Sequence, residues 1–89
     1  MVLRMVKISG GDGFSFKEAI KISDCSNIEG VEQEYIEVRK RLGNYQLIRQ
    51  SLQDKSERMY DVLELKLEDG REITFYFDIT DFFGKGFEF

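Results

Sequence analysis

Histidine is absent from this chain, and cysteine occurs once, at Cys25. Without an imidazole, neither a Ser-His-Asp nor a Cys-His arrangement can be assembled from this chain alone, and no histidine can bind a metal. A single cysteine excludes an internal disulfide and is typical of a reducing compartment, so we expect a cytoplasmic protein. No apolar run approaches the roughly 18 residues that a membrane span needs. The sequence favours a non-enzymatic protein and predicts no catalytic residue, cofactor or metal site.

Negative charge exceeds positive charge, because 17 acidic residues stand against 13 basic ones and give the 89 residues a formal net charge of −4. The imbalance lies in residues 59–89, where three basic side chains stand against eight acidic ones. Binding to phosphate backbones or to anionic lipids requires a positive patch, so the charge argues against nucleic acid and membranes as partners. A chain of this length makes one domain with a small core, and we expect it to span residues 1–89.

The clearest element is an amphipathic helix over residues 27–42. Ser26 and Glu29 stand at the spacing of a capping box, and Gly43 supplies the left-handed residue that ends many helices. Apolar residues recur at steps of three and four, which places them on one face of the helix. We expect this core-facing stripe to consist of Ile28, Val31, Tyr35, Val38 and Leu42.

Residues 59–79 read as a β-hairpin whose register follows from its apolar pattern. A two-residue turn at Asp69 and Gly70 would place the leucines of the first strand opposite the polar face of the second. A three-residue loop over residues 68–70 repairs the mismatch, with Gly70 left-handed in a bulge. This register pairs Leu65 with Ile73, Leu63 with Phe75 and Asp61 with Phe77.

Three further segments have strand character, at residues 2–9, 19–23 and 45–53. Together with the helix and the hairpin they give the order β-β-α-β-β-β. The sequence therefore predicts an α+β fold, in which one helix packs on one face of a mainly antiparallel sheet of four or five strands.

Two stretches resemble a group of small single-domain prokaryotic proteins to which no function is assigned. They are "GDGFSFKEAIKI" near the start and "YDVLELKLEDGREITFYFDITDFFGK" near the end, so the resemblance extends loosely over residues 10–85. It implies a small, soluble, intracellular domain that stands alone. It carries no catalytic or binding residue over to this chain.

The stretch "YFDITDFFGKGFEF", residues 76–89, is unusually aromatic. Two interpretations stay open. The aromatic side chains fold back to close a small core, or some of them form an exposed apolar patch for a protein partner or for a second copy of the chain. The predicted interaction surface consists of Tyr76, Phe82, Phe83, Phe87 and Phe89.

The leading functional hypothesis is therefore a non-enzymatic interaction module, or a small domain that associates with itself. The alternative is a small-molecule or metal binder, or an enzyme, that uses a pocket of carboxylates and tyrosines. Its residues would be Tyr60, Asp61, Tyr76 and Asp78, which the sequence places near one end of the hairpin.

Overall fold

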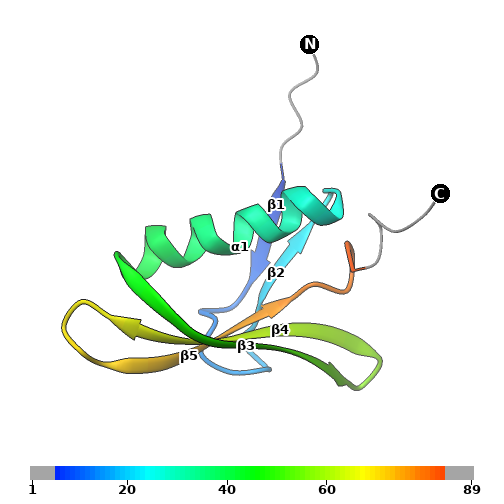
Figure 1. Ribbon diagram of the computed structural model, residues 1–89. Helices are drawn as coiled ribbons and strands as arrows, with labels where there is room; N and C mark the ends of the chain where they lie inside the picture. The colour runs from blue at the N-terminus through cyan, green and yellow to red at the C-terminus, as the bar shows by residue number, and fades with distance from the viewer. Residues whose placement is uncertain (1–5, 84–89) are drawn as a thin grey trace, which may run out of the picture.

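The predicted order of elements and the α+β class are confirmed in the structure, a computed structural model that describes residues 6–83. The elements are β1 (Lys7–Gly10), β2 (Ile20–Ser23), α1 (Asn27–Leu42), β3 (Tyr45–Lys55), β4 (Arg58–Leu67) and β5 (Glu72–Asp78). The strands lie in the order β1-β2-β5-β4-β3, and every neighbouring pair is antiparallel except β2 and β5. Figure 1 shows an open, twisted sheet with α1 across one face.

The β4–β5 hairpin has the predicted register, in which Leu63 lies opposite Phe75. The N–H of Leu67 donates to the carbonyl oxygen of Arg71 at 2.8 Å and closes the three-residue loop. Within that loop Gly70 has a φ of 89°, a left-handed conformation that glycine adopts without steric cost. The turn chemistry and the alternation of side chains therefore agree on one register.

The core lies between α1 and the face of the sheet that α1 covers. Alternate residues of β4 and β5 point to this face, as the two-residue period of a strand requires. The side chains buried there come from α1, from three strands and from the segments that follow β2 and β5. They are Ile20, Ile22, Cys25, Val38, Leu63, Leu65, Phe75, Phe77, Ile79 and Phe82.

The bounds and the N-terminal cap of α1 are as predicted. The Ser26 hydroxyl accepts from the Glu29 backbone N–H at 3.2 Å, and the Glu29 carboxylate accepts from the Ser26 backbone N–H at 2.8 Å. At the other end the Gly43 N–H donates to the Arg39 carbonyl oxygen, and Gly43 has a φ of 80°. Local signals in the sequence thus suffice to set where α1 begins and ends.

The face that α1 turns toward the core differs from the predicted stripe. Val38 is buried, and Tyr35 and Leu42 are half-buried against the core. Ile28, however, is 70% exposed and Val31 is 37% exposed, so the prediction is wrong at these two positions. The apolar stripe of α1 lies at the flank of the buried face rather than at its centre.

Contact with Phe82 explains this rotation of α1. The Phe82 ring lies so close to Gly30 that a Cβ on that residue would be 2.6 Å from the ring. Gly30 is therefore the position at which α1 approaches the core most closely. Glu34 and Glu37 lie one and two turns further along the same face, so they are buried in place of apolar side chains.

The opposite face of the sheet carries a smaller aromatic cluster. Phe16, in the segment between β1 and β2, lies with its ring centroid 5.1 Å from that of Tyr60 and 4.7 Å from that of Tyr76. The ammonium group of Lys55 stands 4.3 Å from the Phe16 ring centroid. This cluster, with Ala19 and Val62, covers part of the face that α1 leaves open.

Several strand boundaries differ by one or two residues from those expected. β3 runs to Lys55 rather than ending at residue 53, and the turn into β4 consists of Ser56 and Glu57, which both have positive φ. Of the strand predicted over residues 2–9, residues 2–5 lie outside the described part of the chain. Among residues 6–83, α1 is neither long nor apolar enough to cross a membrane.

Candidate functional site

β3 forms one edge of the sheet, and its outer side exposes backbone hydrogen-bonding groups. Leu67 donates toward the β5 side, so by alternation the odd-numbered residues of β4 bond toward β5 and the even-numbered ones toward β3. Val62 pairs with Ser51, whose backbone groups therefore point inward. No strand lies on the outer side of β3 among residues 6–83. The residues whose backbone groups point outward are Gln50, Leu52 and Asp54.

The side of β3 that faces α1 carries exposed leucines. Leu47 lies opposite Leu65, and Leu52 lies opposite Asp61, so both leucines point to the side of the sheet on which α1 lies. Leu47 is nevertheless 38% exposed and Leu52 is 57% exposed, because α1 packs over the inner strands. The sheet thus leaves an apolar strip uncovered along its longest strand.

One flank of α1 also carries exposed apolar side chains. The Tyr35 hydroxyl donates to the Gln50 Oε1 at 3.2 Å, which joins α1 to β3. Ile28 and Val31 precede Tyr35 by seven and four residues, so all three share one flank of the helix. We refer to the exposed apolar side chains on either side of this bridge as the α1–β3 surface. They are Ile28, Val31, Leu47 and Leu52.

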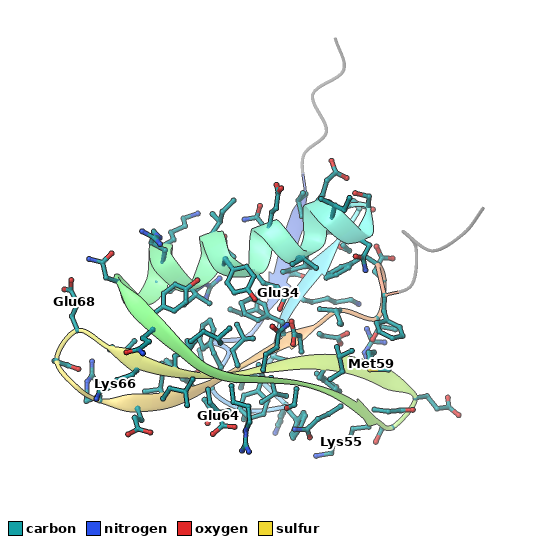
Figure 2. All side chains as sticks on the ribbon, viewed as in Figure 1. Glu34, Lys55, Met59, Glu64, Lys66 and Glu68 are labelled. Atoms are coloured by element: carbon teal, nitrogen blue, oxygen red, sulfur yellow. The ribbon has the colours of Figure 1, made fainter. Side chains whose placement is uncertain are left out.

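Two carboxyl groups are buried beneath the Tyr35–Gln50 bridge. Glu34 of α1 and Asp61 of β4 are 1% and 2% exposed. Figure 2 shows Glu34 between α1 and the strands below it. Gln50 Nε2 donates to Asp61 Oδ2 at 2.7 Å, so the exposed Gln50 side chain separates Asp61 from solvent. Apart from a proton carried by one of these two carboxyls, no donor among the described residues reaches Asp61 Oδ1 or either oxygen of Glu34.

A shared proton reconciles this pair with its burial. Burial, and then the hydrogen bond and charge of Asp61, raise the pKa of Glu34 to about 10. Glu34 is therefore protonated at neutral pH and can donate to the unpartnered Asp61 oxygen. Burial, and then the charges of Glu34 and Asp61, also raise the pKa of the Tyr35 hydroxyl. The result is a polar chain that runs from the α1 flank to a buried carboxylate.

This arrangement can accept a cation or a hydrogen-bond donor, because carboxyl oxygens of the pair have no other donor among residues 6–83. A single negative charge lies under an apolar surface, and the groups around it are amides, carboxyls and a phenol. Among residues 6–83, no cluster of three acidic or cysteine side chains could hold a metal ion. A hollow of about 380 Å³ opens beside Tyr35 on the outer surface of α1, and it is lined by Ile36, Arg39 and Lys40 as well.

The four residues of the predicted carboxylate and tyrosine pocket do not gather. Tyr60 pairs with Asp78, so these two share the sheet face that carries the Phe16 cluster, whereas Asp61 points to the α1 side. Asp78 accepts from the Arg58 guanidinium at 2.6 Å. Although burial alone would raise the pKa of Asp78, its bonds from Arg58 and Thr80 hold it below the usual value. Asp78 thus accepts structural hydrogen bonds at the end of β5.

The predicted aromatic surface is divided between the core and the exterior. Tyr76 is half-buried against the Phe16 cluster, and Phe82 is fully buried in the main core. Phe83 is 44% exposed. Phe87 and Phe89 lie outside the described residues. Of the two described aromatic residues after β5, Phe82 therefore packs in the core and Phe83 lies at the surface.

Neither Glu34 nor Gln50 can be recognised as a site residue from the sequence alone. Glu34 is one of several glutamates on α1, and only the Phe82–Gly30 contact turns it inward. In β3 the register shifts at a bulge between Leu47 and Arg49. Strict alternation from Tyr45 would have placed Gln50 on the far side of the sheet, so the bulge brings it to the α1 side.

Comparison with protein-family models, with curated proteins and with solved structures finds no match to this chain. The resemblance to small prokaryotic proteins therefore stays a prediction.

Proposed function

We propose that this protein is a non-enzymatic interaction domain that binds an extended segment of another protein chain along the outer edge of β3. The observation that carries the proposal is the exposure of Leu47 and Leu52 on a long edge strand beside an apolar helix flank. Natural sheets blunt such edges with charge, bulges or covering segments, because a free edge pairs with other chains. A bound segment would add as a further strand to this sheet.

The two flanking elements supply complementary kinds of contact. Outward backbone groups of β3 give hydrogen bonds that do not depend on the sequence of the partner. Side chains of the α1–β3 surface give apolar contact to alternate residues of the bound segment. The bulge at Leu47 and the exposed Arg49 limit pairing at one end of β3, so the free edge is centred on residues 50–54.

Selection from a library of random nine-residue peptides displayed on phage tests the proposal. We expect the wild-type protein to enrich peptides, and the variant with Leu47→Ser and Leu52→Ser to lose that enrichment. The matched control carries Gln46→Ser and Gln53→Ser, which change the opposite face of the same strand. It should select as the wild type does. Circular dichroism confirms that each variant is folded.

Two results would contradict the proposal. One is a wild-type protein that enriches no peptide, and the other is equal enrichment by the leucine variant. Sedimentation at increasing protein concentration adds a third outcome. A dimer that the leucine substitutions dissociate would assign the edge to a second copy of this chain and would overturn the part of the proposal that names another protein.

We also propose a cytoplasmic location for the protein. The lone Cys25 supports it, because proteins of reducing compartments rarely need disulfides. Imaging of a fluorescently tagged chain in living cells tests this, and a signal confined to an oxidising compartment would contradict it.

A further inference from the structure

The proposed binding edge lies over a charged group that the described residues satisfy only in part. Asp61 and Glu34 are almost fully buried, and three of their four oxygens have no donor within residues 6–83 other than the proton of the pair itself. Burying a carboxylate without full compensation is costly. A domain that needed only a stable core would gain from apolar side chains at these two positions. Even with the shared proton, the pair keeps one buried negative charge, with which a ligand of opposite charge can pair.

The path from the open edge to this pair runs through Gln50. Its side chain is exposed and bonds to Asp61 Oδ2 at 2.7 Å and to the Tyr35 hydroxyl at 3.2 Å. A residue of an added strand that lies opposite Gln50 would point to the same side of the sheet. The added strand would be about 10 Å from β4, two strand spacings away. The long stem of a lysine or an arginine can cross β3 at that position and carry its charge to Asp61.

The neighbours of Gln50 suit apolar residues on either side of such a charge. Leu52 lies two residues further along β3 on the same side of the sheet, and Leu47 lies on that side beyond the bulge. Val31 and Ile28 line the helix flank beyond the Tyr35–Gln50 bridge. In an added strand, the residue two positions from the basic one on one side would face Leu52, and the residue two positions away on the other side would lie beside the bulge that carries Leu47. The surface therefore fits a segment whose basic residue has an apolar residue two positions before it and another two positions after it.

We propose that the segment bound along β3 carries a lysine or arginine opposite Gln50, flanked at two positions on each side by apolar residues, and that its cationic group pairs with the buried Asp61–Glu34 carboxyls. This inference rests on the proposed function and specifies the chemistry of the partner at that site. The basic group would bring a charge to a dry, partly unsatisfied pair, where charge pairing is stronger than at the open surface.

The peptide selection described above provides the first test. Peptides enriched by the wild-type protein should share a lysine or arginine with apolar residues two positions away on both sides. Enriched peptides without a basic residue would overturn this inference and leave the proposed function standing. Failure to enrich any peptide would overturn the proposed function itself.

A double-mutant cycle provides the second test, on the strongest enriched peptide. With the wild-type protein, replacing the basic residue of the peptide by norleucine should weaken binding roughly tenfold or more, as loss of a buried charge partner does. With Asp61→Asn, the same replacement should change affinity by less than about twofold. Glu32→Gln, an exposed charge change on α1, is the matched control and should behave as the wild type. An equal loss with the wild type and Asp61→Asn would contradict the pairing. If Asp61→Asn does not fold, the consensus of the peptides enriched by the wild-type protein decides the question, and a consensus without a basic residue would contradict the pairing.

Discussion

The β4–β5 hairpin and the α1–β3 side of the molecule share one core but differ in what they bury. The hairpin buries Leu63, Phe75 and Phe77 completely, and its apolar pattern, register and turn agree with one another. On the other side, α1 buries two glutamates while β3 leaves leucines exposed. Agreement among apolar pattern, register and turn is typical of a region that stabilises the fold. The disagreement on the α1–β3 side marks it as the region to examine for function.

The two hairpin turns repeat this contrast. Between β4 and β5, the left-handed position is occupied by Gly70. Between β3 and β4, two non-glycine residues, Ser56 and Glu57, have φ values of 51° and 64°. A left-handed conformation is strained for residues with a side chain. The β3 side therefore carries backbone strain that the β4–β5 side avoids.

The largest effect that we expect is the difference in stability loss between a leucine truncation in the hairpin and one in β3. Leu63→Ala should lower the free energy of unfolding by about 2–5 kcal/mol, because it empties a fully buried site. Leu52→Ala should change it by less than about 0.5 kcal/mol, because that side chain is already 57% exposed. Urea denaturation of both variants measures the difference. Equal losses would show that β3 is packed as tightly as the hairpin.

The next effect concerns Glu34 and is a dependence of stability on pH. With its folded pKa raised to about 10, Glu34 keeps a proton that the unfolded chain releases above about pH 4.3. Its contribution to stability is therefore complete below about pH 4.3 and is lost as pH rises toward 10, by up to ~1.4 kcal/mol per pH unit. Denaturant midpoints should fall between pH 5.5 and pH 8.5.

Glu34→Gln isolates this effect, because glutamine cannot ionise. Its midpoint should change far less across the same range, whereas the exposed control Glu32→Gln should follow the wild type. Asp78 has a lowered pKa and loses its contribution only as pH falls toward acid values, so the window above pH 5.5 excludes it. The Tyr35 hydroxyl also has a raised pKa and stays neutral there. A wild-type midpoint that rises with pH would contradict the buried, protonated carboxyl.

The smallest effect concerns the strained turn. Replacing Ser56 and Glu57 by Asn and Gly should stabilise the protein by about 1 kcal/mol, because these residues accept the left-handed conformation. Gly70→Ala, in the other hairpin, should destabilise it by a similar amount, since Gly70 has a φ of 89°. Thermal melts compare the two changes. Destabilisation by the Asn-Gly turn would show that Ser56 and Glu57 make contacts worth more than their strain.

The elements that could be predicted from sequence are those fixed by local or paired signals. The Ser26 capping box, Gly43 and the Leu63–Phe75 register each depend on residues close in sequence or on simple alternation, and all are confirmed. The candidate site depends on contacts between distant segments. Phe82 and Gly30 are 52 residues apart in the chain, so no periodicity within α1 can reveal their contact.

The carboxyl pair shows the same limit at the level of single residues. The sequence predicts a pocket that joins Asp61 to two tyrosines and Asp78. In the structure these partners lie on the other face of the sheet. Its true neighbours, Glu34 and Gln50, are brought to it by the rotation of α1 and by the bulge in β3. A bulge of one residue reverses every side chain beyond it. Such a reversal has no strong sequence signal in a strand as polar as β3.

Amide hydrogen exchange, followed residue by residue with and without the strongest enriched peptide, shows whether a segment binds along β3. We expect binding to slow exchange at the outward amides of Gln50, Leu52 and Asp54. The inward amides of Arg49, Ser51 and Gln53 already bond to β4 and should change little. Protection that falls equally on both sets, or only on β1 at the other edge of the sheet, would contradict the binding of an extended segment along β3.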